Sequence, residues 1–204
     1  YKILKSEKLA DKIYLMEVEA PRVAKHCQPG QFIIVKMDEK GERIPLTICD
    51  YDREKGTVTI VFQTVGVSTA KMAELKAGDC FSDFVGPLGC ASGLIETDIE
   101  ELKKKKIVFI AGGVGTAPVY PQVKWLHEHG IEADVSACNA TGEEGKDVAT
   151  EISLLVAECR PQFLELTKSD VNSSPVATGI KIANQREYSA VVVKCSRAYR
   201  EFRR

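Results

Sequence analysis

The sequence of 204 residues has no long apolar segment and almost no net charge. No segment approaches the roughly 20 apolar residues that a membrane-spanning helix needs, and the N-terminus lacks the apolar core of a signal peptide. Basic residues number 28 and acidic residues 29, so no overall field favours nucleic acid or a membrane surface. We therefore expect a cytoplasmic protein with no membrane span and no nucleic-acid partner.

Closely spaced cysteine pairs are also missing. The 7 cysteines are scattered singly and none forms a Cys-x-x-Cys pair, so neither a zinc site nor a regular disulfide framework is expected. They are predicted to be small buried residues or free thiols. The 3 histidines have no cysteine or carboxylate at a metal-ligand spacing, so no metal site is predicted.

What the sequence does contain is a glycine-rich turn between a predicted strand and a predicted helix. An apolar, β-branched segment after Lys106 leads into Gly112–Thr116 and Pro118, and a helical pattern of apolar residues follows. This order directs free helical N–H groups toward a bound phosphate, and glycine lets the ligand approach the backbone. The spacing is neither the dinucleotide fingerprint nor a P-loop. By itself, the turn fits a nucleotide site and an ordinary strand-to-helix turn equally well.

Residues 1–98 are predicted to form an antiparallel β-barrel. Short segments rich in β-branched and aromatic residues alternate with turns that contain Gly or Pro, which is typical of a small barrel. One helix is expected at Ser68–Lys76, with Ser68 or Thr69 as its N-cap and Gly78 after its end. The expected strands are Ile3–Glu7, Ile13–Glu19, Gln31–Met37, Thr47–Asp50 and Thr57–Thr64.

Residues 99–204 are predicted to form a shortened, doubly wound α/β domain, because predicted strands alternate with predicted helices. Ser169–Glu187 is polar and is expected to be a loop. After the glycine turn, the expected elements are strands at Ile131–Val135, Phe163–Leu166 and Tyr188–Val193 and a helix at Val148–Cys159.

Five motifs occur in a fixed order over roughly the first 135 residues. They are Pro29-Gly-Gln-Phe32, Arg43-Ile-Pro-Leu-Thr47, Gly66-Val-Ser-Thr69, Gly86-Pro-Leu-Gly89 and Ala111-Gly-Gly-Val-Gly-Thr-Ala-Pro118. This series resembles the ferredoxin–NADP reductase superfamily, and most closely its prokaryotic branch of electron-transfer subunits. That branch includes the small FAD subunit of NADH-dependent ferredoxin–NADP oxidoreductase, or sulfide dehydrogenase, and the electron-transfer subunit of dihydroorotate dehydrogenase.

The resemblance implies FAD in the barrel and a nicotinamide nucleotide, NAD(P)H, on the α/β domain. Thr47 is then expected near flavin N5, where it affects hydride transfer and is the catalytic residue. Residues expected to bind FAD are Arg43, Pro45, Leu46, Thr47, Val61, Phe62, Gln63, Gly66, Ser68 and Thr69. Residues expected to face the nicotinamide nucleotide are Gly112, Gly113, Val114, Gly115, Thr116 and Pro118.

The sequence departs from the family in two regions. Ile44 stands where the family arginine is expected, and Arg43 precedes it. The long Arg43 side chain can still reach a phosphate, although strand alternation would otherwise direct it to the face opposite the flavin. Beyond about residue 136, the late cysteines of a [2Fe–2S] centre are missing except for Cys195, so no cluster ligands are expected in this chain. A short paralogue, a fragment of a longer protein and a coding sequence altered near residue 136 all fit these departures.

These features predict an FAD-dependent NAD(P)H oxidoreductase subunit that exchanges electrons with an iron–sulfur protein or a larger catalytic partner subunit. An alternative is a flavin-binding, non-catalytic or regulatory subunit with a degenerate nucleotide domain. A third interpretation is a domain that has this fold but no redox chemistry. The segment Val135–Asn139 contains neither the acid that selects NAD nor the arginine that selects NADP, so both nucleotides are compatible with the sequence.

Overall fold

The computed structural model of the chain describes residues 1–138 and 190–195. The chain divides into two compact units, the barrel unit (Tyr1–Ser92) and the second unit (Gly93–Arg204). The division therefore lies between residues 92 and 93, compared with the predicted boundary between residues 98 and 99. Within the described ranges, no helix has both the length and the apolar character needed to cross a bilayer.

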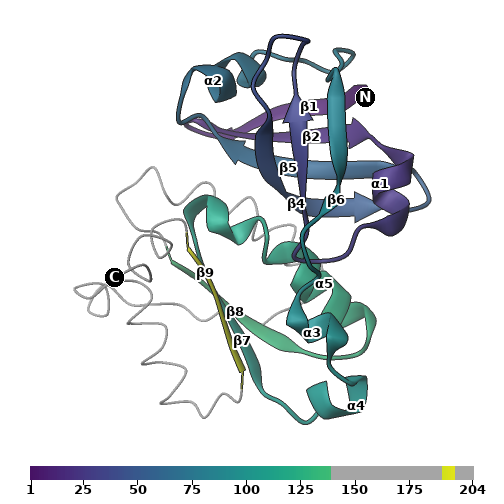
Figure 1. The fold of residues 1–204 in the computed structure, drawn as a ribbon. Helices are drawn as coiled ribbons and strands as arrows, with labels where there is room; N and C mark the ends of the chain where they lie inside the picture. Colours follow the sequence, from purple (N-terminus) through teal and green to yellow (C-terminus); the bar gives the residue numbers. More distant parts are fainter. Residues whose placement is uncertain (139–189, 196–204) are drawn as a thin grey trace. The chain divides into compact units, whose positions relative to one another are not determined.

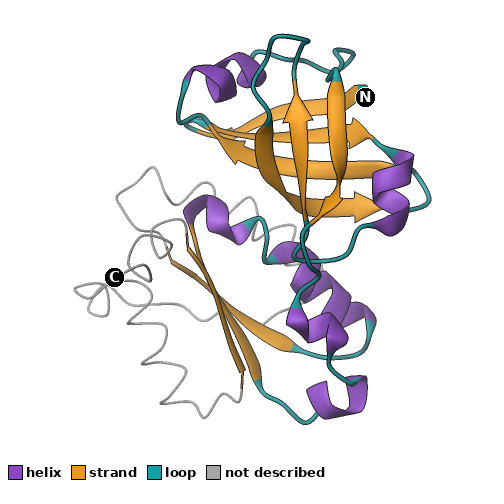
Figure 2. Ribbon diagram, in the orientation of Figure 1, coloured by secondary structure: helices purple, strands orange, loops and turns teal. Residues whose placement is uncertain are grey.

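The barrel unit is a six-stranded antiparallel sheet with two short helices (Figures 1 and 2). The strand order is β1-β2-β5-β4-β3-β6. The two ends of the sheet meet, because the Ile3 N–H donates to the Asp79 carbonyl at 2.8 Å and the Phe81 N–H to the Tyr1 carbonyl at 2.9 Å. The predicted antiparallel barrel is confirmed. Its elements are β1 (Ile3–Ala10), β2 (Ile13–Glu19), α1 (Pro21–His26), β3 (Phe32–Lys36), β4 (Ile44–Asp52), β5 (Thr57–Gln63), α2 (Val67–Ala73) and β6 (Asp83–Leu88).

Alternation along the strands separates a buried core from an outer face. On β3, Ile33 and Val35 are fully buried, whereas Phe32 and Ile34 are only half-buried. On β4, Ile48 is buried in the core, with Ile44 and Leu46 packed against it, so the residues between them point outward. Each large apolar side chain that leaves water in this core contributes about 1.5–3 kcal/mol. The outer face is thus available for a ligand without loss of core packing.

Several parts of the barrel differ from the prediction. β1 extends to Ala10 rather than Glu7, and β4 spans Ile44–Asp52 rather than Thr47–Asp50. Helix α1 is not predicted at all, and β6 contains Gly86 and Pro87, which the sequence indicates as a turn. Pro87 falls where the ladder with β3 shifts register, so its missing N–H is not required there. Helix α2 begins at Val67 with Gly66 as its N-cap and ends at Ala73, so the predicted N-cap at Ser68 or Thr69 is wrong.

The described part of the second unit is a three-stranded parallel sheet of order β8-β7-β9 with short helices (Figure 2). The central strand β7 is buried on both faces from Ile107 to Ala111, as is typical of parallel sheets. Gly112 pairs with Cys138 on one side and Cys195 on the other, so the three strands end at the same level. Its elements are α3 (Gly93–Glu96), α4 (Ile99–Leu102), β7 (Ile107–Gly112), the 3-10 helix η1 (Gly113–Thr116), α5 (Tyr120–Glu128), β8 (Ala133–Cys138) and β9 (Ala190–Cys195).

Two predicted strands of this unit correspond to β8 and β9: β8 begins two residues later than the predicted Ile131, and β9 overlaps the predicted Tyr188–Val193 over its described residues. The glycine turn between β7 and α5 also lies where the sequence places it. The predicted helix Val148–Cys159, the strand Phe163–Leu166 and the loop Ser169–Glu187 lie outside the described residues. The doubly wound domain as a whole therefore stays a prediction.

Candidate functional site

The outer face of β4 carries two of the residues predicted to contact a flavin. Thr47 pairs with Phe32 of β3, and Pro45 pairs with Ile34. Pro45 is exposed and Thr47 is half-buried, and no described residue forms a hydrogen bond with the Thr47 hydroxyl. This face therefore combines apolar side chains with one hydroxyl that has no hydrogen-bond partner among the described residues.

Strand β5 adds to the same face. Ile48 of β4 pairs with Ile60, and continuing this register by one residue places Val61 across from Thr47. Gln63 follows two positions later and is exposed. Phe62 has the opposite orientation and stacks on Tyr14 in the core, with ring centroids 5.8 Å apart.

Two residues of the predicted site thus direct their side chains away from this face. Phe62 is a core residue, and Leu46 packs against the core between the outward-facing Pro45 and Thr47. The reason is the two-residue period of a strand, which turns consecutive side chains to opposite faces. At these two positions the side chain stabilises the core instead of contacting the outer face.

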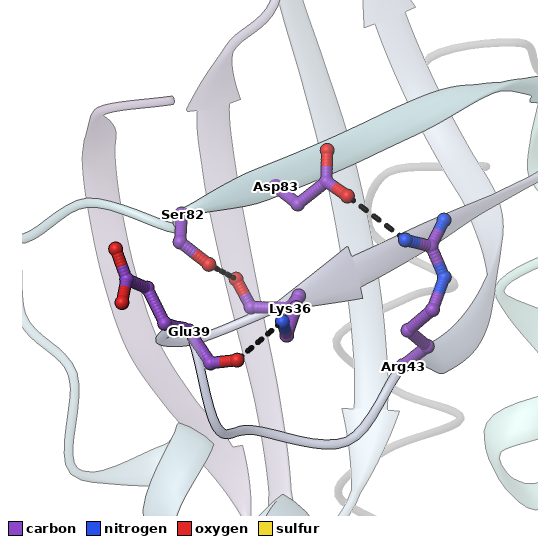
Figure 3. A network of polar contacts seen from close by, with 5 residues as sticks. All are labelled: Lys36, Glu39, Arg43, Ser82 and Asp83. Carbon is purple, nitrogen blue, oxygen red and sulfur yellow. Dashed lines mark hydrogen bonds and ion pairs between the residues drawn. The ribbon is translucent and has the colours of Figure 1, made fainter.

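Arg43 forms an ion pair with the carboxylate of Asp83 (Figure 3). It immediately precedes β4, and its Nη1 lies 3.0 Å from Oδ2 of Asp83, the first residue of β6. Asp83 precedes the core residue Phe84, so it points outward, and Arg43 lies on the same face as Pro45. The expectation that strand alternation directs Arg43 to the face opposite the flavin is therefore wrong, whereas its long side chain does lie on the proposed flavin face. Their side chains are 52% and 36% exposed, and pairs of this kind contribute about 0–1 kcal/mol. Asp83 therefore orients the guanidinium without fixing it strongly.

The two hydroxyls predicted to hold a pyrophosphate have different partners. The Thr69 hydroxyl accepts hydrogen bonds from the backbone N–H groups of Val65 at 2.9 Å and of the N-cap Gly66 at 3.1 Å, so Thr69, as the third residue of α2, satisfies donors just before the helix. The Ser68 hydroxyl donates to a carboxylate oxygen of Glu42. Sequence reasoning missed Glu42, although an acid directly before a predicted phosphate-binding arginine is a signal that the sequence contains.

Two of the family motifs contact each other at the end of β6. The Gln31 side-chain amide donates to the Gly89 carbonyl at 3.1 Å, and Phe32 pairs with Leu88. Gly89 has φ +76°, and a Cβ there would lie 2.9 Å from the Phe32 ring. Gly89 therefore allows both the turn and the position of the Phe32 ring beside Thr47.

The predicted nucleotide residues gather at the carboxyl end of β7. The strand order changes direction there, since β8 lies on one side of β7 and β9 on the other. Such a switch point is where open α/β sheets bind ligands. Thr116 is 1% exposed, and its hydroxyl has no hydrogen-bond partner among the described residues. A buried hydroxyl without a partner lowers the free energy of unfolding by about 1–3 kcal/mol, so the Thr116 hydroxyl is a candidate contact for a ligand.

The thiols of the barrel core are unsuited to redox or nucleophilic chemistry. Burial raises the pKa of Cys27 to about 11, and burial also raises the pKa of Cys49, which follows Thr47 by two positions. Cys80 and Cys90 are exposed. Across residues 1–138 and 190–195, no cluster of three or more His, Cys, Asp or Glu side chains is placed to hold a metal ion.

Comparison with known proteins gives sequence relatives for the chain, although no family model matches it. A Clostridium beijerinckii protein, described only as uncharacterized and in the adh 3′ region, is 63% identical over 148 residues, which are 72% of this chain and 49% of that protein. The dihydroorotate dehydrogenase B (NAD(+)) electron transfer subunit homolog of Thermotoga maritima is 39% identical over 128 residues, 63% of this chain and 43% of that protein. The chain thus spans about half the length of the curated relatives it matches.

Solved structures give the same result for the fold. The structure of an NADH-dependent reduced ferredoxin–NADP oxidoreductase, determined to study flavin-based electron bifurcation, superposes with a TM-score of 0.77 at 28% identity. The superposition covers 96% of this chain and 67% of that chain. The resemblance of this chain to the ferredoxin–NADP reductase superfamily, and to its prokaryotic electron-transfer subunits, is therefore confirmed by both sequence and fold.

Proposed function

We propose that this chain is a flavin-dependent electron-transfer subunit, with FAD on the barrel unit and a nicotinamide nucleotide on the second unit. The observation that carries the proposal is the outer face of β4, where Pro45 and the open Thr47 hydroxyl lie beside the apolar Phe32 and Ile34. Such a face suits a planar ring system. The names of the similar proteins, an electron transfer subunit homolog and an NADH-dependent oxidoreductase, support redox chemistry.

The residues present fit FAD in three respects. Pro45 and Phe32 offer apolar contacts to a planar ring, with the buried Val61 next to Thr47, and the Thr47 hydroxyl offers one polar contact. The Arg43 guanidinium and the Ser68 hydroxyl can donate to phosphate oxygens once their carboxylate partners are displaced. Bound FAD would accept a hydride from the nicotinamide and release the electrons to an acceptor.

The second unit fits a nicotinamide nucleotide at the end of β7. Gly112 and Gly113 keep the turn free of side chains, so a ligand can approach the backbone closely. The buried Thr116 hydroxyl would gain the hydrogen bond that it lacks among the described residues. The predicted contacts of Val114, Gly115 and Pro118 belong to the same turn and form part of this proposal.

The residues of the barrel would act by positioning. Pro45 has a restricted backbone and no N–H, so it presents a rigid surface that holds a ring in one plane. A hydrogen bond from the Thr47 hydroxyl contributes about 0.5–1.5 kcal/mol, and one pKa unit or one factor of ten in rate corresponds to about 1.4 kcal/mol. Loss of this hydroxyl should therefore slow hydride transfer by up to about tenfold.

The proposal includes a protein partner that receives or supplies the electrons. The Thermotoga maritima relative is named an electron transfer subunit homolog, and such a subunit implies a larger catalytic or iron–sulfur partner. In the similar oxidoreductase structure, the studied process is flavin-based electron bifurcation. For this chain we propose a ferredoxin-type protein or a larger subunit as the partner.

The test is the absorbance spectrum of the purified chain after incubation with FAD, removal of free FAD, and anaerobic addition of NADH or NADPH. We expect a flavin band that bleaches, with Thr47→Val slowing the bleaching and Thr47→Ser restoring most of the rate. Thr59→Val, on the outer face of the neighbouring strand, is the matched control and should leave the rate unchanged. A flavin band that neither nucleotide bleaches would favour the non-catalytic flavin subunit, and a colourless protein would refute the proposal.

A further inference from the structure

The chain leaves the barrel unit through a short connector, residues 89–92, which follows β6 and ends where the second unit begins (Figure 1). This connector is held on the barrel at both of its ends. The Gln31 side-chain amide donates to the Gly89 carbonyl at 3.1 Å, and the Ser92 N–H donates to the Pro29 carbonyl at 2.8 Å. The point at which the chain enters the second unit is therefore fixed to the Pro29-Gly-Gln-Phe32 motif.

The connector lies closely on this motif. Gly30 has φ +96°, and a Cβ there would lie 2.8 Å from the Ser92 nitrogen, a distance at which one of the two residues would have to shift. The Gln31 side chain is itself held from two sides, because its Oε1 accepts a hydrogen bond from the Gln28 N–H at 2.8 Å while its Nε2 donates to Gly89. These two bonds fix the orientation of the Gln31 amide, since only its oxygen accepts and only its nitrogen donates.

Gln31 also contacts the strand that is proposed to carry the flavin. Its carbonyl accepts a hydrogen bond from the Ile48 N–H at 3.2 Å, and Ile48 directly follows Thr47 on β4. Phe32, the next residue along the chain, pairs with Thr47. Gln31 thus joins the connector to the backbone beside Thr47 through two of its own groups, the side-chain amide and the main-chain carbonyl.

The side-chain bond of Gln31 adds little to the stability of the barrel. The ladder between β3 and β6 ends at the pair Phe32–Leu88, so β6 is already paired before the connector begins. Gly89 is exposed and Gln31 is half-buried, and water can replace a hydrogen bond at such a place. What the bond does restrict is the freedom of the connector on the barrel surface.

We propose that Gln31 is a positioning residue for hydride transfer, because it fixes the point at which the second unit is attached to the barrel. This role rests on the proposed function, since it needs a flavin on one unit and a nicotinamide nucleotide on the other. In the transfer, the C4–H bond of the dihydronicotinamide breaks and an N5–H bond forms on the flavin. One proton and two electrons thus pass together from the nucleotide, which is oxidised, to the flavin, which is reduced.

This reaction is sensitive to small displacements. The reacting atoms must come within about 3–3.5 Å of each other, and a misplacement of about 1 Å can lower the rate about 100-fold. An attachment point that moves on the barrel shortens the fraction of time spent in the reactive geometry. Loss of the Gln31 side-chain bonds should therefore slow the transfer without weakening the binding of either ligand.

The first test measures hydrogen exchange in the flavin-free full chain by mass spectrometry and compares it with the Gln31→Met variant. Methionine has nearly the length of glutamine, but it cannot donate to a carbonyl and is only a weak acceptor. We expect the connector amides, above all that of Ser92, to exchange about two- to tenfold faster, as the loss of one hydrogen bond predicts. Gln28→Met is the matched control, because Gln28 contributes its backbone N–H to this contact, and it should leave the connector unchanged.

The second test compares two hydride donors on the FAD-loaded chain by anaerobic stopped-flow absorbance. NADH or NADPH needs the nucleotide site of the second unit, whereas N-benzyl dihydronicotinamide carries the same reacting ring without a nucleotide. We expect Gln31→Met to lower the limiting rate of flavin reduction by the nucleotide about three- to tenfold, with its half-saturating concentration unchanged. The rate with the benzyl donor should stay the same. Thr47→Val, by contrast, should slow reduction by both donors.

Gln31→Glu isolates the bond to the connector. Its carboxylate still accepts from the Gln28 N–H but cannot donate to the Gly89 carbonyl, so it should behave like Gln31→Met in both tests. Gln28→Glu is the control for the added charge. It should leave connector exchange and both reduction rates at the values of the parent chain.

Each remaining outcome has a separate meaning. Unchanged exchange in the connector, or faster exchange with an unchanged rate for the nucleotide, would show that Gln31 does not position the transfer, while the proposed function stands. Equal slowing with both donors would show that Gln31 shapes the flavin site, which also overturns the positioning role. A folded parent chain that binds no FAD, or whose FAD reacts with the benzyl donor but with neither nucleotide, would refute the proposed function and this role with it.

Discussion

Replacement of Thr116 by valine tests whether the Thr116 hydroxyl binds a ligand or stabilises the fold. Valine has nearly the shape of threonine but cannot form a hydrogen bond, and Thr116 is 1% exposed with an unpartnered hydroxyl among the described residues. The substitution therefore removes a buried polar group and leaves no cavity. We expect opposite effects on stability and on binding of the nicotinamide nucleotide.

The structure allows a magnitude for each effect. A buried hydroxyl without a partner costs about 1–3 kcal/mol, so Thr116→Val should raise the free energy of unfolding of the second unit by about 1–2 kcal/mol. A hydrogen bond to the nucleotide contributes about 0.5–1.5 kcal/mol, so its loss should raise the KM for the nucleotide by about two- to tenfold. Thr116→Ser keeps the hydroxyl but removes a methyl group, which should lower stability by about 1 kcal/mol and leave binding nearly unchanged.

Trp125 makes the measurement specific to the second unit. It is the single tryptophan of the sequence and lies on α5, so urea unfolding followed by its fluorescence reports this unit. The KM is measured from the initial rate of flavin reduction at increasing NADH and NADPH. A Thr116→Val variant that loses stability and keeps its KM would show that the hydroxyl serves the fold, and the ligand interpretation would be refuted.

Three further predictions concern the barrel unit. Gly89→Ala places a Cβ 2.9 Å from the Phe32 ring at φ +76°, so it should lower the free energy of unfolding by about 1–3 kcal/mol in a urea titration, whereas Gly41→Ala, whose Cβ would lie 3.4 Å from the Asp38 backbone and which has no positive φ, should cost less. Iodoacetamide followed by peptide mapping should label Cys80 and Cys90 but not Cys27 or Cys49 in the native chain, because burial raises the pKa of both core thiols; labelling of Cys49 at native conditions would contradict this. The pKa of Asp52 is lowered from 3.8, chiefly by a hydrogen bond from the Lys55 backbone N–H and also by the Lys55 side chain and the Glu54 N–H, although desolvation opposes them. The stabilising contribution of this carboxylate is therefore present above pH 3.8 and is lost as the pH falls through its folded pKa. Between pH 5 and pH 3, the free energy of unfolding of Asp52→Asn should fall less than that of the parent chain.

Much of the barrel follows from local patterns in the sequence. The β2 strand has the predicted bounds, Ile13–Glu19, and β5 differs from its prediction by one residue at its end. These strands carry apolar side chains at alternate positions in the core, and such a period is visible without any knowledge of long-range contacts. The glycine turn after β7 could be placed for a similar reason, because clustered glycines interrupt an apolar strand.

The parts that sequence reasoning missed depend on contacts between distant segments. Helix α1 is only six residues long and has no side-chain cap, so its sequence carries little signal. β6 includes Pro87 because its ladder with β3 shifts register at that point, which no local pattern indicates. The Ser68–Glu42 bond joins residues 26 positions apart, so it also could not be read from either motif alone.

The site shows why a motif is more than a set of ligand-binding residues. Phe62 and Leu46 stand inside two predicted flavin segments, yet both side chains belong to the core, because neighbours on a strand face opposite ways. Conversely, Gly89 carries no functional group, but its lack of a Cβ leaves room for the Phe32 ring, and Phe32 pairs with Thr47. A chain of contacts therefore runs from the turn after β6 to the hydroxyl proposed to meet the flavin. Within such a motif, we propose that part of the sequence contacts the ligand, whereas the rest holds those residues on one face, so the two roles have to be assigned residue by residue.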